Sequence, residues 1–252
     1  MSWIASDAYI GKSLELYGEY SASETTLFQH FVQPASTVLD VGANIGVFTI
    51  ALARLVTPTG AVLAFEPQQA VFDVLSTNVE ANFLTNVTLH QVGVGRDLGT
   101  LNVPALDYDV PGNFGGVELS GITDKGTPVD VITIDSLDLA ACNFIKIDVE
   151  GMESEVIAGA ADTIRKLRPV IFIENDRKQK SAEIIEALFD LNYRIYLHLA
   201  SLYNATNFFK NTENVFGPIV SANMLCLPSE FDQNIKGMTE VQTADDMLSV
   251  LR

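Results

Sequence analysis

A glycine-containing turn followed by a carboxylate is the clearest chemical pattern in the sequence. The turn runs from Gly42 to Gly46 and follows a short apolar run that ends at Asp40 and Val41. Because glycine lacks a Cβ atom, the backbone can bend sharply there and lie close to a bound ligand. Glu66 follows Gly46 by twenty residues, and a carboxylate at that spacing can accept hydrogen bonds from ribose hydroxyls. The pattern therefore predicts a nucleotide-like ligand.

Residue 44 narrows the choice of nucleotide. Turns that bind dinucleotides follow the pattern Gly-x-Gly-x-x-Gly, in which backbone amides contact the pyrophosphate. In this chain Asn44 stands where the middle glycine would be, and no lysine or arginine lies in the turn. The Asp40 carboxylate would repel a diphosphate and attract a cation. An adenosine with a positively charged amino-acid tail fits better, which indicates S-adenosylmethionine as the cofactor.

Two further carboxylates, Asp148 and Glu150, stand at the end of the apolar run that begins at Phe144. If that run is a strand of a parallel sheet, both side chains lie at its carboxyl end, where such sheets bind ligands. Either carboxylate could act as a general base or hold a substrate hydroxyl. They could also serve as partners of Lys146, because a lone charge in a buried strand is costly. We expect each of these interpretations to be partly correct.

A third acidic position ends the following apolar run. It is Glu174, and Asn175 and Asp176 come directly after it. Together with Asp148 and Glu150, these side chains could hold Mg²⁺ or Ca²⁺, and such an ion would lower the pKa of a substrate hydroxyl. Solvated loop carboxylates are the more common situation. We therefore assign no metal ligand at this stage and do not favour a metal cofactor.

Histidine supplies one more candidate for proton transfer. His198 lies near the end of a strand-like run and could reach the ligand cleft as a base. A single histidine in a strand is more often structural, so this role has weaker support than the carboxylates. His30 is expected on a helix surface and His90 on a strand.

The segments that position these residues alternate between strands and helices. Short apolar runs bounded by turn residues predict buried strands, at 38–41, 61–65, 87–92, 144–149, 170–173, 193–199 and 224–227. Apolar residues at helical spacing predict helices, over about 23–33, 47–56, 69–83, 154–167 and 181–191, with a short one after Thr243. The connection after the sixth strand has no helical period, so strands six and seven should pair antiparallel. We expect an α/β fold with a Rossmann-like, doubly wound, seven-stranded sheet, mostly parallel, whose last strand is antiparallel.

One domain is expected for residues 1–252, because no repeat or low-complexity linker interrupts the pattern. The aromatic-rich residues 1–35 would form either a lid over the ligand or a packed N-terminal arm, and the arm is slightly favoured. Residues 95–128 are rich in glycine, aspartate and proline, which predicts a long substrate-side insertion with short strands near 100–104 and 129–134. Within it, Asn113 to Gly116 could lay backbone over a substrate or form an ordinary flexible loop.

Charge and composition limit the partners. The net charge is −17 with only 15 lysines and arginines, which argues against nucleic acid and against an anionic membrane surface. No apolar run reaches the roughly 18 residues of a membrane span, and the first twenty residues carry too many charges for a signal peptide. Cys142 and Cys226 are expected to be buried free thiols, too few for a thiolate metal site. We expect a cytoplasmic monomer or homodimer that acts on a small molecule.

Three longer motifs contain the chemical residues. They are Val38-Leu39-Asp40-Val41-Gly42-Ala43-Asn44-Ile45-Gly46, Ala64-Phe65-Glu66-Pro67 and Phe144-Ile145-Lys146-Ile147-Asp148-Val149-Glu150-Gly151. In these motifs the chain resembles the FkbM family of class I S-adenosylmethionine-dependent methyltransferases. The pattern continues at Phe72, Leu75, Asn78, Asn82, Val156, Gly159 and Ala160. The resemblance covers Tyr17 to Pro228. One departure is Gly93-Val94-Gly95, where the family commonly has Ala-Val-Gly.

The resemblance implies roles for individual residues. Gly42, Asn44 and Gly46 would shape the site for the methionine end of the cofactor. Glu66 would hold the ribose, and Asp148 the ammonium group. The candidate cofactor-binding residues are Glu19, Asp40, Gly42, Ala43, Asn44, Gly46, Glu66, Pro67, Val94 and Asp148. The candidate catalytic residues are Asp148, Glu150 and His198.

The family also implies an activity, which is methyl transfer, mostly to an oxygen of a small molecule such as a sugar or a natural-product hydroxyl. Methylation of an amine nitrogen or of a peptide terminus is the nearest alternative. A nicotinamide-dependent, NAD(P)-binding oxidoreductase would share the strand, turn and acidic residue, although Asn44 disfavours it. A non-catalytic module would bind the cofactor and transfer nothing.

Overall fold

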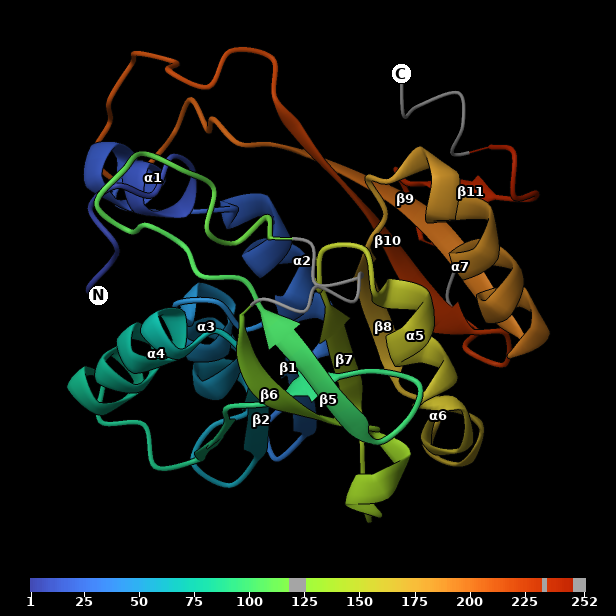
Figure 1. Cartoon of the computed structure of the whole chain (residues 1–252). Coiled ribbons are helices and arrows are strands. Elements are labelled where there is room, and N and C mark those ends of the chain that lie inside the picture. Colours follow the sequence, from blue (N-terminus) through green and yellow to red (C-terminus); the bar gives the residue numbers. More distant parts are fainter. Residues whose placement is uncertain (118–125, 233–234, 247–252) are drawn as a thin grey trace.

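An eight-stranded sheet forms the centre of the protein (Figure 1). The structure is a computed structural model, and it describes residues 1–117, 126–232 and 235–246. The order of strands in the sheet is β11-β9-β10-β8-β7-β1-β2-β3. These strands are β1 (Thr37–Val41), β2 (Ala61–Phe65), β3 (Val87–His90), β7 (Phe144–Ile147), β8 (Val170–Glu174), β9 (Tyr193–Ser201), β10 (Val220–Pro228) and β11 (Thr239–Val241).

All seven predicted strands are present, and their pairing follows the prediction. The strand β1 lies between β2 and β7 and is parallel to both, with Val38 opposite Phe144. The strand β10 runs antiparallel to β8 and β9. The strand β11 is additional and pairs antiparallel with the edge strand β9. Three residues are too few to show a sequence period, so tertiary pairing rather than local pattern creates this eighth strand.

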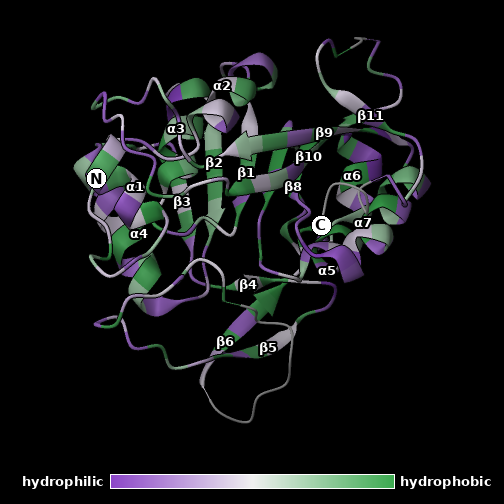
Figure 2. Cartoon of the chain, turned by 90° about the horizontal axis from the view of Figure 1, so that it is seen from above, coloured by the Kyte–Doolittle hydropathy of each residue, from purple (hydrophilic) through white to green (hydrophobic). Residues whose placement is uncertain are grey.

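Helices cover both faces of the sheet (Figure 2). One face packs on α2 (Ala22–Phe31), α3 (Val47–Leu55) and α4 (Gln69–Ala81). The other packs on α5 (Glu153–Ala158), α6 (Ala161–Leu167) and α7 (Lys178–Asp190). Neighbouring residues of a strand point to opposite faces, so Val38 contacts the first layer and Leu39 the second. This double burial explains why the central strands are continuously apolar.

The predicted helix over 154–167 is wrong as a single element, because it is divided into α5 and α6. The break lies at Gly159 and Ala160, where the Gly159 carbonyl accepts a hydrogen bond from the backbone amide of Asp135 (2.9 Å). A Cβ atom on Gly159 would collide with the backbone of Gly95. A new helix then begins, and the Asp135 carboxylate accepts hydrogen bonds from the backbone amides of Asp162 (3.1 Å) and Thr163 (2.7 Å). A side-chain oxygen from a distant segment therefore caps the start of α6.

A second, three-stranded sheet flanks and partly overlaps the region predicted as an insertion (Figure 2). It consists of β4 (Gly93–Val94), β5 (Gly99–Val103) and β6 (Thr127–Ile132), in the order β4-β6-β5. The strands β5 and β6 lie close to the two short strands that the sequence predicts. A short 3₁₀ helix at Asp135–Leu137 follows. The part of the insertion at 118–125 lies outside the described residues.

The two ends of the chain add elements that the sequence only partly predicts. Before α2 lies α1 (Ile10–Tyr17), which the sequence does not predict. Near the other end, Asp246 accepts hydrogen bonds from the amide of Thr243 (2.9 Å) and from its hydroxyl (3.1 Å), the contact expected of a helix start. The helix predicted beyond it falls largely on 247–252, outside the described residues.

The remaining composition-based expectations concern thiols and membranes. Cys142 and Cys226 are buried and free, as predicted, and burial raises the pKa of the Cys142 thiol to about 12. Within the described part of the chain, the helices are too short or too polar to cross a bilayer.

Candidate active site

A cavity of about 260 Å³ opens at the carboxyl ends of β1, β2, β7 and β8. It lies where open α/β sheets bind their ligands. The glycine turn and the strand ends line one side. The opposite wall comes from the N-terminal segment, the loop around 113–117 and the beginning of β10, through residues such as Tyr9, Tyr20, Gly116 and Ser221. Segments from both ends of the chain therefore complete one site.

Three residues of the turn after β1 have positive φ values. Gly42 and Gly46 have φ values of +78° and +91°, and Asn44 has +50°, all in the left-handed region. A Cβ atom on Gly42 would collide with the carbonyl oxygen of Asp148. The turn therefore lies directly against the end of β7, and this contact depends on glycine.

Glu66 is held firmly in the cavity wall and is 4% exposed. Its two carboxylate oxygens accept hydrogen bonds from the backbone amides of Asn44 (3.0 Å) and Gln68 (2.9 Å). Burial raises the pKa of Glu66 to about 7. A carboxylate oxygen can accept more than one hydrogen bond. Both oxygens of Glu66 can therefore still accept donors from a ligand in the cavity.

Lys146 crosses from β7 to the turn and is 3% exposed. Its ammonium group donates a hydrogen bond to the Gly42 carbonyl (2.8 Å) and lies 3.5 Å from Asp40 Oδ1 and 3.3 Å from Asp148 Oδ2. Burial lowers the pKa of Lys146, but Asp148 and Asp40 outweigh this and raise it above its ordinary value. The interpretation of the strand-end carboxylates as partners of Lys146 therefore applies to Asp148.

Asp40 faces away from the cavity. It is fully buried, and Thr49 on α3 donates a hydrogen bond to its Oδ2 at 2.6 Å. With Lys146 on its other oxygen, this carboxylate anchors the back of the turn. It contributes to a ligand site through Lys146 and the backbone rather than by direct contact.

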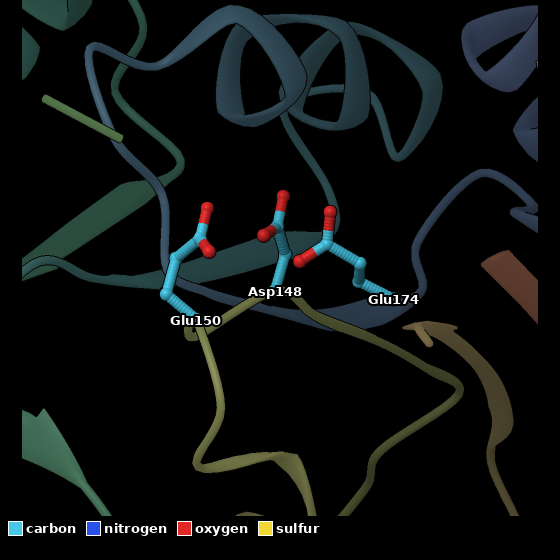
Figure 3. A group of neighbouring side chains, drawn as sticks. All are labelled: Asp148, Glu150 and Glu174. Atoms are coloured by element: carbon cyan, nitrogen blue, oxygen red, sulfur yellow. The ribbon is translucent and has the colours of Figure 1, made fainter. Parts of the chain in front are cut away.

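A group of carboxylates occupies the other end of the cavity. Oxygens of Asp148, Glu150 and Glu174 all lie within 4.8 Å of one another (Figure 3). Glu150 does not pair with Lys146, because it accepts a hydrogen bond from Arg177 at 2.8 Å. Burial, followed by repulsion from Asp148, raises the pKa of Glu150 to about 7. The same two causes raise the pKa of Glu174 well above its ordinary value.

The family model for the methyltransferase FkbM domain matches residues 40–195, more than half of the chain. This protein belongs to the FkbM methyltransferase domain family. The match begins at Asp40, includes the turn, Glu66 and all three clustered carboxylates, and ends within β9. Residues 1–39, which include α1 and α2, lie outside it.

Two curated relatives carry similar sequences. "Methyltransferase 1" of Beauveria bassiana (strain ARSEF 2860) is 31% identical over 151 residues, which cover 50% of this chain and 59% of that protein. "Methyltransferase sdnD" of Sordaria araneosa is 29% identical over 185 residues, which cover 61% of this chain and 71% of that protein. The similarity thus spans less than two thirds of the first relative's length.

The Rossmann-like fold recurs in solved methyltransferase structures. Precorrin-6y C5,15-methyltransferase from Geobacter metallireducens GS-15 superposes with a TM-score of 0.51, covering 82% of this chain and 87% of that one. Its sequence identity is 16%, so this similarity concerns the fold alone.

Most of the FkbM-family site candidates meet in the cavity. Its lining includes Gly42, Ala43, Asn44, Glu66, Pro67, Val94, Asp148 and Glu150. Gly46 ends the turn as the N-cap residue of α3. Glu19 and His198 lie elsewhere. The Glu19 carboxylate accepts hydrogen bonds from Asn204 Nδ2 (2.7 Å) and the Phe208 amide (2.9 Å), which holds the β9–β10 connection. The His198 ring packs against Phe172, with 5.5 Å between ring centroids.

Other residues at the site escape sequence reasoning. Tyr20 lies between α1 and α2 and lines the cavity, where burial raises its pKa well above the ordinary value. Glu24 on α2 is buried beside it and accepts a hydrogen bond from Asn223 Nδ2 at 2.9 Å. Burial raises the pKa of Glu24 to about 7. An acidic residue in the first turn of an amphipathic helix is typical of the protein surface. The sequence therefore does not predict that Glu24 is buried beside the cavity.

These buried glutamates predict an unusual pH dependence of stability. Glu24, Glu66 and Glu150 each have a pKa of about 7, raised first by burial from the ordinary value of 4.5. The folded chain therefore binds more protons than the unfolded chain between these values, so the free energy of unfolding falls as pH rises through this window. Thermal unfolding of the ligand-free protein should show a midpoint several degrees higher at about pH 5 than at about pH 7.5.

The variant Glu24→Gln provides the control for this prediction. Glutamine stays neutral across the window, so the variant should show a flatter dependence of the unfolding midpoint on pH. A wild-type midpoint that rises from about pH 5 to about pH 7.5 would contradict the assignment of these carboxyl groups as buried and protonated.

Proposed function

We propose that this protein transfers the methyl group of S-adenosylmethionine to a hydroxyl oxygen of a small molecule. The observation that carries the proposal is the position of Glu66. Its carboxylate is held by the backbone of Asn44 and Gln68 beside the glycine turn, in a chain of the FkbM methyltransferase domain family. The turn and the acid at the end of the second strand are the parts of this fold that bind an adenosine ligand.

In this proposal the cofactor lies along the ends of β1, β2 and β7. Glu66 accepts hydrogen bonds from the two ribose hydroxyls. The turn from Gly42 to Gly46, where the backbone can approach a ligand closely, would hold the methionine end. Asp148, which lies 3.3 Å from Lys146, would hold its ammonium group. Val94 lines the same cavity and contributes an apolar surface for the adenine.

The carboxylates at the far end of the cavity suit the chemistry of the acceptor. When bound, S-adenosylmethionine would supply an activated methyl group for transfer to a substrate oxygen, with S-adenosylhomocysteine as the other product. The hydroxyl proton passes to a nearby carboxylate. Glu150, with a pKa of about 7, can accept a proton near neutral pH. Orientation of the two reactants supplies much of the remaining rate enhancement.

Binding and transfer experiments test the proposal in sequence. Isothermal titration should show binding of S-adenosylhomocysteine and no binding of NAD⁺ or NADP⁺. Incubation with methyl-labelled S-adenosylmethionine and a set of sugars, polyketide alcohols, amines and peptides should then transfer label to hydroxyl compounds. Label on amines or peptide termini would support nitrogen or terminus methylation instead. Binding of a nicotinamide dinucleotide without S-adenosylhomocysteine would contradict the cofactor assignment.

A further inference from the structure

Three carboxylates from two segments converge at the acceptor end of the cavity. Asp148 and Glu150 follow β7, and Glu174 ends β8. Figure 3 shows their carboxyl groups pointing to the same side of the strand ends, with Asp148 between the two glutamates. Each contributes an oxygen to a set whose members all lie within 4.8 Å of one another. Two ligands of one ion can lie no farther apart than twice the metal–oxygen distance, roughly 4.2 Å for Mg²⁺ and about 5 Å for Ca²⁺. The spacing therefore suits Ca²⁺ as it stands, and Mg²⁺ would require the carboxylates to move slightly closer together.

Glu174 provides an independent indication of a missing partner. Its Oε2 atom is buried and has no hydrogen-bond partner among the described residues. Buried polar atoms in folded proteins are nearly always paired, with protein, water or an ion. A proton on one of the neighbouring carboxyl groups would supply a single hydrogen bond. One cation can contact this oxygen and the other two carboxylates together.

Local charge favours the same conclusion. Asp176 adds a fourth carboxylate next to the three. Against these stand Arg177, which is paired with Glu150, Lys146, which Asp148 shares with the buried Asp40, and Lys180, which donates a hydrogen bond to the Gly151 carbonyl. Among the described residues, acidic groups thus remain in excess in a partly buried site, where a counter-charge is favourable.

We propose that Asp148, Glu150 and Glu174 bind one divalent cation that prefers oxygen ligands, of the Mg²⁺ or Ca²⁺ type. One oxygen of Asp148 can bind the ion while the other keeps Lys146, since a carboxylate offers several acceptor positions. The binding of the ion stands independently of the activity proposed above. Its role rests on that proposed function: a cation at this end of the cavity would lower the pKa of the acceptor hydroxyl, and with the ion bound Glu150 would act as its ligand rather than as the proton acceptor.

The test uses Mn²⁺ as a paramagnetic probe on the full chain after treatment with a chelator. Electron paramagnetic resonance should show one bound Mn²⁺ per chain at high ionic strength, where binding to scattered surface acids is screened. Competition with Mg²⁺ and with Ca²⁺ then shows which ion the site prefers. The variants Glu174→Gln and Glu150→Gln, tested separately, should each weaken Mn²⁺ binding about tenfold or more.

Glu183→Gln is the matched control, because Glu183 is exposed on α7 and outside the cluster. It should leave Mn²⁺ binding unchanged, and thermal unfolding confirms that each variant is folded. The proposal is overturned if the wild type binds no Mn²⁺, or if Glu174→Gln binds it as tightly as the wild type.

Absence of Mn²⁺ binding together with methyl transfer to an amine would indicate that the three carboxylates bind a positively charged acceptor instead of a metal ion. Titration with S-adenosylhomocysteine tests the proposed function separately. If this ligand does not bind, the proposed function is contradicted, but the proposed cation site is not affected.

Discussion

Alanine in place of Glu66 is expected to weaken the binding of S-adenosylhomocysteine about 100-fold while the protein stays folded. The change removes two hydrogen bonds between ribose hydroxyls and a charged group, each typically worth about 1.5 kcal/mol, and about 1.4 kcal/mol corresponds to a factor of ten. Isothermal titration above pH 7 is the suitable measurement, because Glu66 has a pKa of about 7 and is mainly ionised there.

Two further variants separate the loss of ligand contacts from disturbance of the turn. Glu66→Gln keeps one acceptor oxygen for Asn44 or Gln68 and should lose less affinity than alanine. Glu80→Ala, on the exposed side of α4, should bind like the wild type. If the Glu66→Ala protein binds S-adenosylhomocysteine as tightly as the wild type, the assignment of Glu66 to the ribose hydroxyls is contradicted.

The variant Gly42→Ala is expected to cause a large loss of stability. The φ value of +78° is unfavourable for alanine, and the added Cβ atom would collide with the Asp148 carbonyl oxygen. Because the obstacle is backbone in the central strands, neither partner can move aside without disturbing β1 or β7. We expect a loss of at least about 4 kcal/mol in the free energy of unfolding, measured by denaturant titration.

Gly99→Ala is the matched control for the same substitution. A Cβ atom at Gly99 meets nothing within 4 Å, and its φ is not in the left-handed region. This variant should stay within about 0.5 kcal/mol of the wild type. Near wild-type stability of Gly42→Ala would show that the turn can move away from β7, contrary to the structure.

Sequence patterns predict the sheet and most of the cofactor side of the site. The apolar runs that start at Val38, Ala61 and Phe144 give buried parallel strands, because such strands need apolar side chains on both faces. The turn at Gly42 and the acid at Glu66 are local features with fixed spacing, so they are visible without coordinates. The same applies to Asp148 and Glu150, whose place at a strand end brings them to the ligand edge.

Patterns along the chain do not predict contacts between distant segments. The break after α5 lies where Gly159 packs against Gly95, and β11 forms by pairing with β9. The placement of Glu19 against Asn204 and of His198 against Phe172 also depends on chain folding. Neither Glu19 nor His198 reaches the cavity, although a carboxylate or an imidazole would be a suitable group in an active site.

The sequence by itself determined the class of fold, the position of the turn and the acids that accompany it, because these depend on local periodicity and residue type. Only the tertiary structure decided which acid meets which base: Lys146 with Asp40 and Asp148, Arg177 with Glu150, and Glu174 with neither. The physical reason is that pairing of charges depends on distances across strands and loops, and side-chain spacing along the chain does not contain those distances.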